Sequence, residues 1–115
     1  MIEINILIVD DQEEIRLLLG HILRKAGYEE LDFSSTAQET FAIIKAKEDI
    51  DLILLDINLP DKNGIEICKE LKSKEKLKDT PIIMVTGEED NNTLDRAFSA
   101  GAIDYITKPV ARIEL

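Results

Sequence analysis

The 115-residue chain lacks several features that mark whole classes of protein. It has one cysteine, Cys68, so no internal disulfide can form, and we expect a reducing, cytoplasmic location. It has no run of 18 apolar residues and no charged-then-apolar leader, which predicts neither a membrane-spanning nor a secreted protein. Bases are scarce, 14 against 24 acids, and the net charge of −10 argues against direct nucleic-acid binding.

The chain also has no internal repeat, no low-complexity tract and no Pro/Gly/Ser-rich linker. Apolar residues make up 44% of it and charged residues 33%, the balance of an ordinary globular protein. Its length suits one hydrophobic core. We therefore expect a single domain over residues 1–115.

Apolar runs and helical patterns alternate along the sequence. Strands are predicted over residues 4–9, 31–34, 52–55, 81–85 and 103–106. Between them, apolar residues recur at spacings of three and four, which is typical of amphipathic helices; Cys68 falls in such a pattern and is expected to be buried. The short connections favour an α/β fold, a doubly wound five-stranded parallel sheet. Only residues 110–115 remain for the last helix, so we expect it to be truncated.

Side chains suited to chemistry stand at the ends of four predicted strands. Asp10 and Asp11 follow the first strand, Asp56 the third, Thr86 the fourth and Lys108 the fifth. Each alone has an ordinary interpretation, as a helix cap, a turn residue or a surface charge. In a sheet of order 2-1-3-4-5, however, all would line one crevice at the carboxyl edge. There the acids could bind magnesium, and the hydroxyl and the ammonium could hold an anion.

The chain resembles a response-regulator receiver domain of the CheY-like superfamily, which acts in two-component signalling. The resemblance covers essentially the whole chain, and both order and spacing fit. The matching residues are Asp10-Asp11, Asp56, Pro60, Gly64, Thr86, Ala100-Gly101-Ala102, Tyr105 and Lys108-Pro109. It implies a flavodoxin-like (βα)5 fold with strand order 2-1-3-4-5 and a switch controlled by phosphorylation.

The resemblance also implies a metal site and a phosphoacceptor. Asp56 would accept a phosphoryl group from a histidine kinase or a histidine phosphotransfer protein. Asp11, Asp56 and the backbone carbonyl of Asn58 would bind one Mg²⁺ directly, with Asp10 acting mostly through water. The only chemistry implied is the domain's own phosphoryl transfer and dephosphorylation, so it would be a signalling protein rather than an enzyme.

Further residues carry implied roles in the response to phosphorylation. Thr86 and Lys108 would contact the phosphoryl oxygens, and a cis peptide bond before Pro109 would aim the lysine. Movement of Thr86 would let Tyr105 turn inward and relay the change to an output surface. Asn58 and Glu88 would flank the path of the hydrolytic water, which predicts an acyl phosphate lasting minutes or less.

The end of the sequence suggests a larger protein. Residues 108–115 resemble receivers that continue into a further helix and an effector, so residues 1–115 would be the N-terminal part of a longer response regulator. The expected partners are therefore a C-terminal effector domain or a second copy, paired through the helix 4–strand 5–helix 5 face. His21 and Leu17 point away from the apolar stripe of the first helix and are expected at the surface.

Three other functions fit the sequence less well. A magnesium-dependent phosphatase with an aspartyl nucleophile usually has Asp-x-Asp at its first strand, whereas Asp10 is followed by Asp11 and Gln12. A flavodoxin-like cofactor binder needs a phosphate-binding loop there, and the acids of residues 10–14 would repel a phosphate. A degenerate receiver used only for protein contacts would not need the intact set of acids, hydroxyl and lysine.

Overall fold

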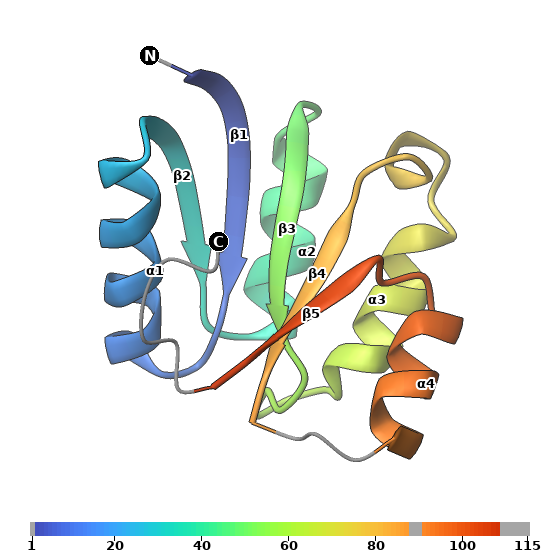
Figure 1. The fold of residues 1–115 in the computed structure, drawn as a ribbon. Helices are drawn as coiled ribbons and strands as arrows, with labels where there is room; N and C mark the ends of the chain where they lie inside the picture. The colour runs from blue at the N-terminus through green and yellow to red at the C-terminus, as the bar shows by residue number, and fades with distance from the viewer. Residues whose placement is uncertain (1, 88–90, 109–115) are drawn as a thin grey trace.

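The computed structural model describes residues 2–87 and 91–108 of the chain (Figure 1). Its elements are β1 (Ile2–Val9), α1 (Glu13–Lys25), β2 (Tyr28–Ser34), α2 (Ala37–Ala46), β3 (Ile50–Asp56), α3 (Gly64–Lys72), the 3-10 turn η1 (Glu75–Leu77), β4 (Ile82–Thr86), α4 (Asn91–Ser99) and β5 (Asp104–Thr107). The five strands form one parallel sheet in the order β2-β1-β3-β4-β5. This confirms the predicted flavodoxin-like architecture. The predicted truncated last helix falls on residues outside the described part.

Two layers of apolar side chains cover the two faces of the sheet. Leu7 and Val9 of β1 point into a core with α2, α3 and α4, whereas Ile6 and Ile8 point to the side of α1. Successive strand residues face opposite sides, so a strand covered on both faces must be apolar throughout. This is why residues 6–9 of β1 and 52–55 of β3 form continuous apolar runs. Cys68 is fully buried in the first of these cores, as predicted.

The residues that the structure describes cover the sheet less completely on the side of α1 than on the opposite side. On the α1 side, the apolar side chains of Ile4, Leu52, Ile83 and Ile106 are only partly buried, and they line a pocket of about 210 Å³. Figure 1 shows α1 lying over the β2 edge, away from β4 and β5.

The strands differ from the sequence-based prediction at several of their ends, and the largest difference is at the start of β2. β2 begins at Tyr28 rather than Leu31. Because β2 is an edge strand, the exposed Glu29 and Glu30 interrupt its apolar pattern without ending its hydrogen bonding to β1. β3 extends to Asp56, so the acid is the last strand residue rather than the first of the loop. The η1 turn was not predicted.

The helix termini follow the local sequence. The Thr36 hydroxyl caps α2 by accepting from Glu39 N at 3.0 Å, and the Glu39 carboxylate accepts from Ser35 N at 2.8 Å. His21 and Leu17 are exposed on α1, Leu17 to 65%, as predicted. Within residues 2–87 and 91–108, no helix combines the length and apolarity that crossing a membrane requires.

Candidate functional site

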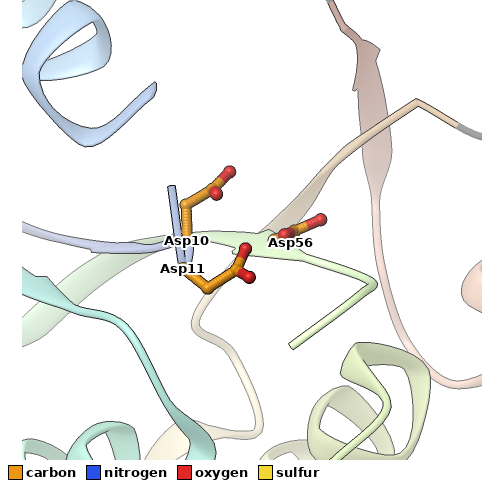
Figure 2. Close-up of side chains that lie close together, drawn as sticks. All are labelled: Asp10, Asp11 and Asp56. Atoms are coloured by element: carbon orange, nitrogen blue, oxygen red, sulfur yellow. The ribbon is translucent and has the colours of Figure 1, made fainter. Parts of the chain in front are cut away.

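Three carboxylates meet at the carboxyl edge of the sheet (Figure 2). Asp10 and Asp11 follow β1, and Asp56 ends the neighbouring β3. One carboxylate oxygen from each residue lies within 4.8 Å of the other two. Asp10 is 1% and Asp56 2% exposed, whereas Asp11 is open to solvent. The structure therefore brings together the three acids that the sequence placed at one edge.

Lys108 is the cation that faces this cluster from β5. Its Nζ lies 3.0 Å from Asp10 Oδ2 and 3.5 Å from Asp56 Oδ2, and it donates a hydrogen bond to Gln12 Oε1 at 3.2 Å. Its backbone N donates to the carbonyl of Thr86 at 2.8 Å, which fixes the lysine at the end of β4. One ammonium thus stands against two buried carboxylates and a third at the surface.

The surroundings of Asp56 disfavour its charged form. Its pKa is raised from 3.8 to about 6, chiefly by burial and then by the neighbouring Asp10. The Lys108 ammonium and the N–H of Asn58, which donates to Asp56 Oδ1 at 3.2 Å, act in the opposite direction. The site therefore holds more negative charge than its one lysine compensates.

The oxygens of Asp10 show that the cluster suits a divalent cation. Oδ1 accepts a hydrogen bond from Gln12 N at 2.9 Å. Oδ2 faces the Lys108 ammonium as an ion pair, but it is buried without a hydrogen bond from the described residues. The Lys108 ammonium offsets part of the charge of this oxygen, whose capacity to accept a hydrogen bond is left for a water or an ion. The set contains only oxygen ligands, the type that Mg²⁺ prefers, so these residues fit that ion.

The loop after β3 is folded tightly against Asp56. Asn58 and Asn63 form an isolated antiparallel bridge, and Gly64 N donates to the carbonyl of Ile57 at 2.6 Å. A Cβ at Gly64 would overlap the backbone of Asp56 and Ile57. Glycine at this position therefore lets the start of α3 approach the end of β3.

The predicted switch residues occupy different environments. Thr86 is fully buried at the end of β4, whereas Tyr105 on β5 is 37% exposed. The Tyr105 ring meets Phe98 of α4 edge to face, with centroids 6.0 Å apart. A Cβ added at Gly87 would meet no atom of the described residues within 4 Å. Glu88 and Pro109 lie outside the described residues, and with them the predicted cis peptide bond.

Sequence reasoning missed three residues that hold Asp10 in place. Arg16 Nη1 donates to the Asp10 carbonyl at 2.7 Å, and Asp10 N donates to the Ser34 carbonyl at 3.0 Å. Gln12 binds both the Asp10 carboxylate and the Lys108 ammonium. No motif marks these positions, because three of the four contacts use backbone atoms and the fourth joins residues 96 positions apart.

Comparisons with known proteins agree with this site. Residues 6–115 match the family described as response regulator receiver domain. The chain belongs to this family. It is 31% identical over 91% of its length to the chemotaxis protein CheY homolog of Campylobacter jejuni, of which it covers 81%. The solved structure of the chemotaxis response regulator CheY4 of Vibrio cholerae shares 30% identity and a TM-score of 0.86, with 94% of this chain and 88% of that one covered.

A longer relative is the phosphate regulon transcriptional regulatory protein PhoB of Pseudomonas aeruginosa. The two are 46% identical over the whole of this chain, which spans about half (49%) of the PhoB length. This chain is thus a response regulator receiver domain of two-component signalling. Receiver domains bind Mg²⁺ at an acidic pocket, which corresponds here to the cluster of Asp10, Asp11 and Asp56.

Proposed function

We propose that this receiver accepts a phosphoryl group on Asp56 from a histidine kinase or a histidine phosphotransfer protein. A carboxylate oxygen of Asp56 attacks phosphorus, the N–P bond of the phosphohistidine breaks, and the departing imidazole nitrogen keeps the electron pair. The observation that carries the proposal is the Lys108 ammonium, which lies within 3.5 Å of both buried carboxylates at the sheet edge.

The residues around Asp56 can position the incoming group. Phosphoryl transfer requires an aligned nucleophile and positive charge near the phosphoryl oxygens. The N–H of Asn58 orients the Asp56 carboxylate through Oδ1. Lys108 supplies one positive charge on the β5 side, and we assign Thr86, buried at the adjacent strand end, to a phosphoryl oxygen.

The same acids would hold Mg²⁺. Asp11 is the exposed member, and the charged form of Asp56 is disfavoured by burial and by Asp10, a cost that a bound cation would offset. We therefore assign both as direct ligands together with the carbonyl of Asn58. Asp10 is already engaged by Gln12 and Lys108, which favours its action through water. When bound, the ion neutralises charge on the phosphoryl oxygens.

We also propose the route and the recipient of the signal. Movement of Thr86 toward the phosphoryl group would free space beside β5, and Tyr105 would leave Phe98 to fill it. The changed surface of α4 and β5 would contact an effector domain or a second copy. PhoB, a transcriptional regulatory protein about twice as long, supports the view that residues 1–115 begin a longer response regulator. A cytoplasmic location, typical of the family, belongs to this proposal.

The proposal is tested by incubating the protein with Mg²⁺ and acetyl phosphate, followed by intact-mass measurement. We expect one phosphoryl adduct in the native protein and none in Asp56→Asn or without Mg²⁺. No adduct and no shift with beryllofluoride would instead favour a receiver used only for protein contacts. Repeated turnover of unrelated phosphate esters would favour a phosphatase.

A further inference from the structure

The first turn of α2 is capped from two places. Thr36, the residue before the helix, accepts from Glu39 N at 3.0 Å. Asp61, from the loop after β3, accepts from Ala37 N at 2.8 Å and from Gln38 N at 3.1 Å, one bond to each carboxylate oxygen. Free N–H groups at a helix start need acceptors, and a carboxylate there also meets the positive end of the helix dipole. Asp61 therefore joins two segments of the chain that lie more than 20 residues apart.

Asp61 belongs to the loop that carries Asn58. The base of this loop is fixed by Gly64, which donates to Ile57, and by the bridge between Asn58 and Asn63. Between these two fixed points, the Asp61 side chain holds the loop to the backbone of α2. The neighbouring Lys62 donates to Glu70 of α3 at 2.7 Å, and its ammonium lies 5.5 Å from the centre of the Phe41 ring of α2. The loop and Asp11 line one surface hollow of about 440 Å³. The position of the Asn58 carbonyl relative to Asp11 thus depends on how the loop is held.

The segment that receives Asp61 also holds the other acidic strand end. Ser34, at the end of β2, accepts from Asp10 N at 3.0 Å, and its hydroxyl is hydrogen-bonded to Thr40 of α2 at 2.8 Å inside the protein. The turn between β2 and α2 is therefore tied to Asp10 on one side and to Asp61 on the other. This turn therefore connects Asp10, after β1, with the loop that follows Asp56, through hydrogen bonds that lie outside the carboxylate cluster.

We propose that Asp61 is a positioning residue for the metal site: by anchoring the β3–α3 loop to the start of α2, it holds the Asn58 carbonyl in place for the ion. This rests on the proposed binding of Mg²⁺ by Asp11, Asp56 and Asn58. The two amide donors, that of Ala37 first, lower the pKa of the Asp61 carboxyl, so its anchoring form is the charged one at neutral pH. Because coupling is reciprocal, bound Mg²⁺ should also stabilise the anchor.

The test compares Asp61→Ala and Asp61→Asn with Thr36→Ala, which removes a cap from the same helix turn but leaves the loop anchored. Affinity for Mg²⁺ is read from ¹⁵N–¹H NMR titrations, since the chain has no tryptophan for fluorescence. We expect about fivefold weaker binding in Asp61→Ala, a typical size for coupling between sites. Asp61→Asn, which keeps one acceptor oxygen, should lie between Asp61→Ala and the native protein, and Thr36→Ala should bind as the native protein does. Urea unfolding of each variant shows that it is folded.

A second readout separates positioning from general stability. In the native protein, Mg²⁺ should shift the amide resonances of Ala37 and Gln38, and Asp61→Ala should abolish this shift. Equal Mg²⁺ affinity in Asp61→Ala and the native protein would overturn the inference, as would equal weakening by Thr36→Ala. In either case, Mg²⁺ binding by the native protein would leave the proposed function intact. A native protein that binds no Mg²⁺ would overturn both.

Discussion

Replacing Asp56 by Asn should stabilise the metal-free domain at neutral pH, although it destroys the proposed phosphoacceptor. Asn has nearly the shape of the protonated carboxyl and cannot ionise. In the folded protein, Asp56 is 2% exposed and lies beside Asp10, and its pKa is raised from 3.8 to about 6. The fold therefore favours the neutral form of this side chain, which Asn supplies permanently.

The sign and size follow from proton linkage. Between pH 3.8 and about 6 the folded protein holds the Asp56 proton more tightly than the unfolded chain does. The contribution of Asp56 to the free energy of unfolding is therefore most favourable at low pH. It is lost as the pH rises through about 6. A difference of about two pKa units, at about 1.4 kcal/mol each, corresponds to about 3 kcal/mol lost above pH 7. At pH 5 the free energy of unfolding should have decreased by roughly half of that amount.

The measurement is urea unfolding with EDTA at pH 8 and pH 5, followed by far-ultraviolet circular dichroism. At pH 8 we expect the free energy of unfolding of Asp56→Asn to exceed that of the native protein by about 3 kcal/mol, which corresponds to roughly 10 °C in Tm. The matched control is Asp11→Asn, which removes the same charge from an exposed position and should change stability by less than about 0.5 kcal/mol. Adding Mg²⁺ at pH 8 should stabilise the native protein more than Asp56→Asn.

Two outcomes would refute the reasoning. If Asp56→Asn were no more stable than the native protein at pH 8, burial would not be penalising the charge of Asp56. If its advantage were equal at pH 5 and pH 8, the cause would not be the ionisation of this carboxyl.

Three further predictions concern the same edge of the sheet. Gly64→Ala should cost about 1–3 kcal/mol in urea unfolding, because the added methyl overlaps the backbone of Asp56; native stability would contradict the packing argument. Lys108→Met should raise the pKa of Asp56 further and slow phosphorylation by acetyl phosphate about 100-fold, measured by intact mass; an unchanged rate would show that the ammonium is dispensable. Asn58→Met should lengthen the life of the acyl phosphate, followed as phosphate release, and a native lifetime of hours would refute the predicted rapid hydrolysis.

The sequence predicts most of this fold because burial on both faces leaves a strong signal. Strands such as β1 must be apolar throughout, and a polar residue directly after such a strand can only stand at the sheet edge. Asp10, Asp11, Asp56, Thr86 and Lys108 were found in this way. The start of β2 was missed because one side of an edge strand is open to solvent, so its hydrogen bonding does not require an apolar pattern.

By itself, then, the sequence determined which residues end the strands and therefore which side chains share one edge. Only the tertiary structure decided how deeply each of these side chains is buried and which groups it contacts. It buries Asp56 and leaves Asp11 in solvent. It also joins the loop after β3 to α2 through Asp61. Such contacts link backbone groups to residues far apart in the chain, and a sequence pattern records only neighbours within a strand or a helix turn.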